Sequence, residues 1–482
     1  MSSPLPDGVS KHTAVSGERV PVVARSVLFP FILLTTLFAW WGLANNMTDT
    51  LLPAFKKIMS FDDGKTAWIQ VVCYALGYGC FAIPGAIFMK RFSYKSGVLL
   101  GLGMFVLGTL LFFPSKFFFQ NSALCYFIYL GSIMITFGGL SVLETACNPY
   151  ICAMGDPATA TQRLNFSQSF NPLGSIAGVV LSQIFILSQL NPLTAEDRAK
   201  LTSEKLAEIQ YGELSAISLT YVSIGLILLL TWIMIFFTKM PNLREEDKSV
   251  DFWGTWRRLF RNSNYVCGVG AQFFYVGAQI ACWSFTVRYC MVAFNLEELA
   301  STTPELLRSV DPIGAFFYNC CDKIGFTVFI PRTAEQAGAT YYIFSLILFV
   351  GCRFICTGLM RFIRPAVLLT VLSGLAAILC VFVSQFPGII GVYSLIGVSG
   401  CMSLMFPTIF SMGTSGLGDD TKMGGAGMVM AICGAALLTQ MQGSLSDHLG
   451  TIAVAYLVPA AAFAVITVYA IVVCGKRPTL QK

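Results

Sequence analysis

Charge is scarce in this sequence of 482 residues, and histidine is scarcer. Only 12% of the residues are charged and 55% are hydrophobic, with a mean hydropathy of +0.70, whereas soluble domains are about 25% charged. Histidine occurs only twice, as His12 and His448. Because zinc and di-iron centres rely on clusters of histidine and carboxylate, these numbers argue against a metalloenzyme. We expect a membrane protein without a metal or cofactor.

Long apolar runs make up most of the chain. A helix needs roughly 20 apolar residues to cross about 30 Å of hydrocarbon. The runs are continuous rather than alternating, which favours helices over a β-barrel. The sequence therefore predicts an all-α membrane protein with twelve transmembrane helices, at 27–54, 66–89, 96–114, 124–154, 167–190, 214–238, 264–292, 339–362, 365–384, 387–412, 423–445 and 451–474.

Basic residues in the loops predict the orientation. Most of the 31 lysines and arginines fall on the side of the two termini, which predicts that both termini are cytoplasmic in a multi-pass protein of the cell (inner) membrane. Facing anionic lipid, these loops account for the net charge of +6 without a nucleic-acid partner. We expect no removed signal peptide, because segment 1–25 lacks a charged-then-apolar leader with a small-residue cleavage site. The predicted organisation is a cytoplasmic segment 1–25, a six-helix half 26–238, a basic linker 239–263, a second half 264–474 with an external insertion 291–338, and a cytoplasmic tail 475–482.

An internal repeat links the two halves. PYICAMG (149–155) ends the fourth span and PTIFSMG (407–413) ends the tenth, and each is followed by an acidic and then a basic residue. GAIFMKRFSYK after the second span and GLMRFIRP after the eighth form a looser echo. Two six-helix halves repeated in parallel orientation and joined by a basic loop are typical of the major facilitator superfamily.

Two carboxylates lie within predicted spans. A carboxylate costs about 2.5–3.5 kcal/mol at the centre of a membrane helix, so it is a functional candidate by default. Asp49 lies in the first span, with Asn45 and Asn46 one turn earlier. Glu144 lies in the fourth span, with Asn148 one turn later.

Amides continue this polar pattern in the fifth span. In RLNFSQSFN, Asn165, Gln168 and Asn171 recur every third residue and line one stripe. A sugar needs both hydrogen-bond donors and acceptors for each hydroxyl, which a stripe of amides and carboxylates supplies. The alternative is that these side chains join helices to one another. In the seventh span, Trp283 could stack on a sugar ring, because Gln279 lies one turn earlier on the same side; packing between helices is the competing interpretation.

The chain resembles the family of L-fucose/proton symporters and glucose/galactose porters. The resemblance rests on WGLANNMTDTLLP (41–53), GGLSVLETACNPY (138–150), RLNFSQSFN (163–171), AQFFYVGAQIACWSFTVRY (271–289) and FPTIFSMGTSGLGDDTK (406–422), and covers roughly 27–292 and 339–474. It implies proton-driven uptake of a monosaccharide by alternating access.

The resemblance also implies roles for single residues. Asp49 matches the family's proton-linked aspartate and Glu144 its essential glutamate, and both are candidates for proton coupling. With their polar and aromatic neighbours, the candidate substrate-binding residues are Asn45, Asn46, Glu144, Asn148, Gln168, Asn171, Gln272, Gln279, Trp283 and Phe406.

Two departures from the family pattern limit what is carried over. Met405 and Phe406 stand where fucose carriers have glutamine and tyrosine, so fucose, galactose, glucose and an N-acetylated sugar all stay open. The 291–338 insertion is either a cap over the entrance or a tolerated surface addition. Of the two arginines within spans, Arg288 either snorkels to the interface or faces the cavity, and Arg353 is expected in a gating or packing contact.

Other functions compete with a proton symporter. A sodium-coupled sugar carrier fits the same pattern, because Asp49 and its neighbouring asparagines offer oxygen ligands. A channel is disfavoured by the two intramembrane carboxylates, and a lipid-modifying enzyme by the absence of a usable catalytic set. We expect no enzyme activity. The expected partners are a monosaccharide, the proton and membrane lipid, and the expected state is a monomer.

The sequence predicts a coupling defect for Asp49→Asn. A carboxyl that is alternately occluded and wetted takes up a proton on one side and releases it on the other, and Asn mimics only the neutral form. In proteoliposomes, the variant is expected to lose sugar accumulation under an acid-outside pH difference and to keep counterflow without one. Accumulation that survives in the variant would remove Asp49 as the coupling residue.

Overall fold

The computed structural model describes residues 21–59, 71–118, 120–186, 198, 200–241, 251–326, 330–331 and 334–475. Every regular element in these ranges is a helix, which confirms the all-α prediction. Within the described residues, ten helical stretches are long and apolar enough to cross a membrane. The other two predicted spans, 66–89 and 167–190, correspond within the described residues to shorter helices that follow one another along the chain, at 71–91 and 160–185.

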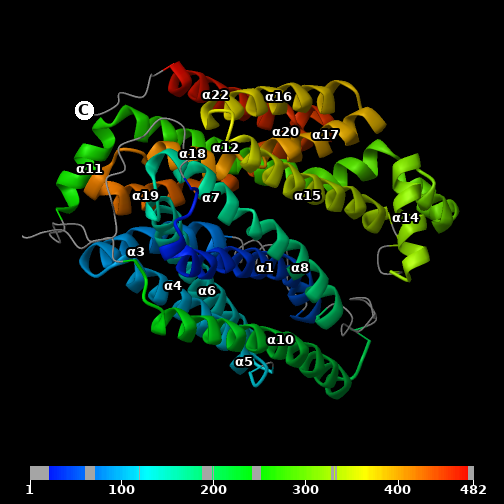
Figure 1. Cartoon of the computed structure of the whole chain (residues 1–482). Coiled ribbons are helices and arrows are strands. Elements are labelled where there is room, and N and C mark those ends of the chain that lie inside the picture. Colours follow the sequence, from blue (N-terminus) through cyan, green and yellow to red (C-terminus); the bar gives the residue numbers. More distant parts are fainter. Residues whose placement is uncertain are drawn as a thin grey trace, which may run out of the picture.

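The helices form two groups, drawn in the lower and upper parts of Figure 1. The first group contains η1 (Arg25–Val27), α1 (Leu28–Met59), the π-helix η2 (Val71–Tyr78), α3 (Gly79–Arg91), α4 (Tyr94–Leu110), α5 (Phe112–Ser115), α6 (Ser122–Ala153), η3 (Pro157–Thr159), α7 (Ala160–Gln168), α8 (Phe170–Phe185) and α10 (Ser203–Phe237). Within it, α4 packs on α6 and α10, and α1 packs on α8.

The second group begins after the short helix α11 (Phe252–Arg261). It contains α12 (Ser263–Ala293), α13 (Leu296–Thr302), η5 (Pro304–Arg308), α14 (Pro312–Ile324), α15 (Ala334–Leu359), α16 (Pro365–Gln385), α17 (Ile389–Met402), α18 (Met405–Thr414), η7 (Gly418–Asp420), α19 (Thr421–Met430), η8 (Ala431–Cys433), α20 (Gly434–Leu449), α21 (Ile452–Ala455) and α22 (Leu457–Gly475). Here α12 packs on α20, α22 and α15, and α16 packs on α22 and α17.

The two groups contact each other at one end. There α19 packs against α3 and α6, and α18 and α15 pack against α7. We call this the closed end; it carries the turns at 155–159 and 415–420. The opposite, open end carries α13 and α14, and Figure 1 shows α11 and α14 at opposite ends of the molecule.

Glycines let α1 and α8 approach closely. A Cβ atom on Gly42 would lie 1.9 Å from the carbonyl oxygen of Asn171, and one on Gly174 would lie 1.9 Å from that of Ala39. Both distances are far below van der Waals contact, so neither position tolerates a larger side chain without separating the helices. This contact brings the asparagine-bearing part of α1 beside the start of α8.

Three predicted spans are interrupted rather than continuous. The helix at 160–185 breaks at Ser169, the tenth span breaks at Ser403–Leu404, and the eleventh passes through the 3-10 turn η8. Proline explains the first two breaks, because Pro172 and Pro407 lack an N–H for the carbonyl four residues earlier. The lengths of the apolar runs did not predict these breaks.

The 291–338 insertion contains helices that are tied to the second group. The carboxylate of Asp311 is buried and caps α14 by accepting a hydrogen bond from the N–H of Gly314 at 2.5 Å. It also accepts hydrogen bonds from the hydroxyls of Tyr341 on α15 at 2.5 Å and Tyr393 on α17 at 3.2 Å. The adjacent Cys320 and Cys321 are both free thiols.

Candidate functional site

A cavity of about 810 Å³ lies between the two groups of helices. It is large enough for a small organic solute, since ligand pockets range over about 300–1,000 Å³. Its lining residues are Trp41, Asn46, Tyr78, Glu144, Gln168, Asn171, Pro172, Ser175, Val276, Gln279, Ile280, Trp283, Ser284, Val287, Tyr342, Leu346, Phe349, Arg353, Phe406, Ile432 and Ala435.

The two walls of the cavity differ in chemistry. The wall from the first group is mostly polar, with Asn46 on α1, Glu144 on α6 and Asn171 on α8. The wall from the second group is mostly apolar and aromatic, with Trp283 and Phe349 on α12 and α15. A solute with hydroxyls on one side and a less polar face on the other matches these walls.

Glu144 lies in the cavity wall and begins a series of polar groups that continues behind this wall. Its side chain is 1% exposed, and its Oε2 atom has no hydrogen-bond partner among the described residues. One turn along α6, the Oδ1 atom of Asn148 accepts a hydrogen bond from Nε2 of Gln168 at 2.9 Å. The backbone carbonyl of Gln168 in turn accepts from Nη1 of Arg353 at 2.9 Å. An unpaired carboxylate oxygen at a cavity wall is available to a solute hydroxyl or a proton.

Arg353 joins the two groups through carbonyls that proline leaves free. Its Nε donates to the carbonyl of Ser403, and its Nη1 donates to that of Gln168. Four residues after these carbonyls stand Pro407 and Pro172, which have no N–H to bond them. The guanidinium also lies 4.6 Å from the ring centroid of Phe349. The packing contact expected of Arg353 is confirmed, because it reaches backbone from both groups, and it also lines the cavity.

Hydrogen bonds hold two tryptophans of the cavity in place. Nε1 of Trp41 donates to the hydroxyl of Tyr78 at 3.0 Å, and Nε1 of Trp283 donates to that of Ser399 at 3.1 Å. The ring of Trp283 also meets that of Phe349 edge-on, with 5.1 Å between centroids. With their N–H groups satisfied, these tryptophans offer the cavity ring surface rather than a donor.

Polar contacts between the groups seal the closed end below the cavity. The hydroxyls of Thr161 and Ser411 are 2.9 Å apart, and Nδ2 of Asn165 donates to Oγ1 of Thr408 at 3.1 Å. These contacts join α7 to α18. A further hydrogen bond of 3.0 Å runs from Nε2 of Gln162 to the carbonyl of Thr357 on α15.

The structure places the sequence-predicted residues in three sets. Those that line the cavity are Asn46, Glu144, Gln168, Asn171, Gln279, Trp283 and Phe406. Those that are fully buried away from it are Asn148, behind Gln168, and Gln272, whose amide has no partner among the described residues. Those whose side chains lie outside the described residues are Asn45 and Asp49, both on α1.

Sequence reasoning missed some of the polar cavity residues. Tyr78, Ser175, Ser284 and Tyr342 line the cavity, but single hydroxyls within apolar runs give no signal of their own. Arg288, considered for a cavity role, is exposed and does not line it.

Comparison with known proteins places the chain among transporters. The family model described as Major Facilitator Superfamily matches residues 32–440. An L-fucose-proton symporter from Haemophilus influenzae is 35% identical, covering 93% of this chain and 97% of that protein. A glucose/galactose transporter from Brucella abortus is 28% identical, covering 98% of this chain and 99% of that protein.

The fold agrees with a solved structure. A crystal structure of the major facilitator superfamily transporter FucP in the outward conformation superimposes with a TM-score of 0.78 and 33% sequence identity. The match covers 93% of this chain and 99% of that one.

The contacts of Arg353 with the carbonyls of Gln168 and Ser403 can be tested through thermal stability. Arg353→Leu leaves both carbonyls without donors, at about 1–3 kcal/mol each, and is expected to lower the midpoint of thermal unfolding in detergent. Adding Pro172→Ala supplies an N–H to the Gln168 carbonyl and is expected to recover part of the loss. Pro172→Ala alone serves as the control. If the double variant unfolds no later than Arg353→Leu, the carbonyl of Gln168 is not what Arg353 satisfies.

Proposed function

Because the chain belongs to the major facilitator superfamily, we propose that it takes up a monosaccharide of the fucose, galactose or glucose type together with protons, by alternating access. The observation that carries this proposal is the cavity between the two groups, which is lined by Glu144, whose Oε2 atom has no partner among the described residues, and by aromatic residues of the second group. The similarity to an L-fucose-proton symporter over nearly the whole chain supports both the sugar and the proton.

The walls of the cavity suit a sugar. Amides such as those of Gln168, Asn171 and Gln279 each offer a donor and an acceptor, as hydroxyls require. Trp283 and Phe406 offer ring faces to the C–H side of a pyranose. Because apolar contacts alone discriminate weakly between sugars, the amides and the carboxylate set the selectivity.

Glu144 and Asp49 are the proposed proton carriers. We propose that Glu144, which lines the cavity, takes up a proton in one state of the cycle and releases it in another, as its access to water changes. Opening the cavity to the other side wets the carboxylate and favours release. Asp49 joins Glu144 in this role through the resemblance of its sequence context, WGLANNMTDTLLP.

The proposed orientation follows from the loops. The closed end carries the basic turns after α3 and α15, and we place it in the cytoplasm with both termini, in the cell (inner) membrane. The structure then corresponds to an outward-facing state. The proposed moving bodies are the halves 26–238 and 264–474, and the protein acts as a monomer. Inward opening requires Arg353 to leave the Gln168 carbonyl and the pairs Thr161–Ser411 and Asn165–Thr408 to separate.

Uptake into proteoliposomes tests the function. An acid-outside pH difference at fixed sodium is expected to drive accumulation of a labelled sugar, and a sodium gradient at fixed pH is not. Accumulation that depends on the sodium gradient and not on pH would show that sodium, rather than the proton, is the coupling ion.

Glu144→Ala is expected to weaken sugar binding about tenfold or more, because it removes an acceptor of charge-assisted hydrogen bonds. Unchanged sugar binding in Glu144→Ala would show that Glu144 does not bind the sugar.

Phe406→Tyr is expected to change sugar preference. Phe406 lines the cavity, and tyrosine restores the hydroxyl found in fucose carriers. A buried hydroxyl favours solutes that can bond it, by about 1–3 kcal/mol over those that leave it unpaired. The measurement is competition by a panel of monosaccharides against one labelled sugar. An identical ranking before and after the substitution would show that position 406 does not contact the solute.

A further inference from the structure

The helix α11 has one face packed on the protein and one face exposed. Thr255 and Leu259 are each 1% exposed, whereas Trp253 is 80% exposed and Phe260 is 69% exposed. Arg257 is also exposed, midway between the two exposed aromatic residues. Positions i, i+4 and i+7 share one side of a helix, so Trp253, Arg257 and Phe260 form a single aromatic and basic face.

Arg261 extends this face, which we call the outer face of α11 (Trp253, Arg257, Phe260 and Arg261). Asp251, at the N-cap of α11, is its nearest acidic residue in the chain and is already engaged. It accepts a hydrogen bond from the N–H of Gly254 at 3.0 Å and pairs with Arg258 at 3.5 Å. Among the described residues of α11, the outer face therefore consists of two aromatic and two arginine side chains.

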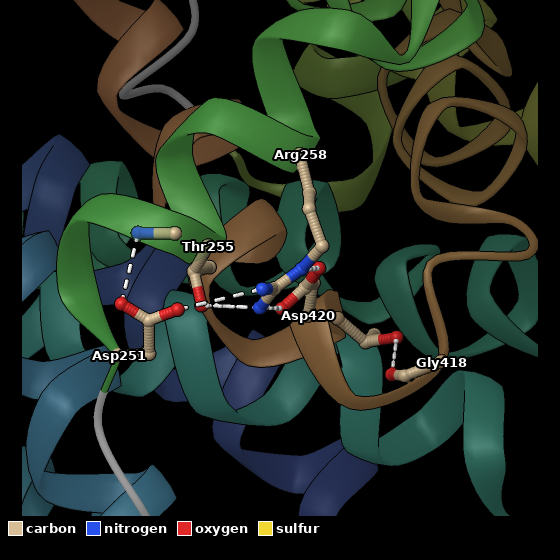
Figure 2. Close-up of polar contacts among 7 residues, drawn as sticks. Asp251, Thr255, Arg258, Gly418 and Asp420 are labelled. Carbon is tan, nitrogen blue, oxygen red and sulfur yellow. Dashed lines mark hydrogen bonds and ion pairs between the residues drawn. The ribbon is translucent and has the colours of Figure 1, made fainter.

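Arg258 fixes the direction in which this face points. As Figure 2 shows, its guanidinium meets the carboxylate of Asp420, with Nε to Oδ2 and Nη2 to Oδ1 both 2.8 Å. The hydroxyl of Thr255 adds a hydrogen bond of 3.2 Å to the same carboxylate. These contacts hold α11 against the start of α19, and Arg257 and Arg261 stay exposed.

Two short turns after transmembrane helices carry the same chemistry. Phe92 is 58% exposed and follows the exposed Arg91 after α3; Phe362 is 73% exposed and stands between the exposed Arg361 and Arg364 after α15. Because these turns directly follow membrane-spanning helices, they lie at the membrane surface. Figure 1 places α11 at this end, running across the ends of the longer helices.

The opposite end differs in charge. In the insertion, the exposed residues Glu297, Glu298 and Glu305 lie on α13 and η5. Phe92 and Phe362, each beside exposed arginines, thus lie at the end where α11 lies. Aromatic rings settle at the depth of lipid head groups, and arginines are attracted to anionic ones.

We propose that the outer face of α11 binds anionic phospholipid of the membrane leaflet at the closed end. Trp253 and Phe260 enter the head-group layer, and Arg257 and Arg261 contact lipid phosphates. Because Arg258 ties α11 to Asp420 at the start of α19, the bound lipid also restrains the helix that packs on α3 at the closed end. The site rests on these residues and is independent of the transported solute.

Brominated lipids test the contact in the full-length protein. The chain is reconstituted into nanodiscs of phosphatidylcholine containing increasing brominated phosphatidylglycerol, and the emission that Trp253→Phe removes is followed. Each arginine near an anionic surface strengthens binding about fivefold. In Arg257→Gln/Arg261→Gln, half-maximal quenching of this emission is expected to need at least about tenfold more phosphatidylglycerol than in the unchanged protein.

Two controls test whether the quenching depends on charge at the outer face. Arg308→Gln removes an exposed arginine at the open end and is expected to leave the titration unchanged. Added salt is expected to weaken quenching by the anionic lipid, because exposed charges are screened. Equal quenching by brominated phosphatidylcholine, or equal titrations of the double variant and the unchanged protein, would overturn the proposal. So would an outer face that stays unquenched by any lipid, which would indicate a protein partner instead.

Discussion

One buried arginine depends on two prolines. A helix interior normally has no spare carbonyl, because each accepts from the N–H four residues later. Pro172 and Pro407 remove that N–H, and Arg353 donates to the two carbonyls that result, one in each group of helices. A guanidinium that is 3% exposed would otherwise carry a large desolvation cost. The breaks in α7–α8 and α17–α18 are therefore what allows a cation to form the floor of the cavity.

The repeated sequence element has the same place in both groups but different contacts. After PYICAMG, Asp156 caps η3, and Arg163 donates from Nε to the carbonyl of Ile151 at 2.9 Å, closing the end of α6. After PTIFSMG, Asp420 binds Arg258 of α11, and Nζ of Lys422 lies 4.8 Å from the ring centroid of Tyr94 in the other group. The first copy contacts its own group of helices, whereas the second copy contacts α11 and the other group. The net result is an asymmetric closed end built from symmetric elements.

Composition and periodicity were enough for the fold class, because about 20 consecutive apolar residues leave few alternatives to a membrane helix. They were not enough to predict at which depth in the helix bundle a side chain lines the cavity. Gln272 and Gln279 are seven residues apart on α12 and so share one side of the helix, yet only Gln279 lines the cavity. The two groups converge toward the closed end, so the same side of α12 meets open space at Gln279 and packed helices two turns earlier. Sequence periodicity reports the angle around a helix and carries no information about this convergence.

The division of chemistry between the walls bears on how the cavity can change access. Glu144, Gln168 and Asn171 belong to the first group, whereas Trp283 and Phe349 belong to the second. In the proposed cycle, a solute keeps most of its hydrogen bonds to the first group while the second group, whose Gln279 adds one amide, moves across its less polar face. Apolar contacts are not directional, so this sliding costs less than exchanging one set of hydrogen bonds for another. The charged contact that crosses the floor, from Arg353 to Gln168, ends on a backbone carbonyl, and its loss can be offset by water once that end opens. Most directional interactions with the solute thus belong to the first group of helices. The hydrogen bond from Arg353 to Gln168, at the floor of the cavity, is the one that exchanges with water.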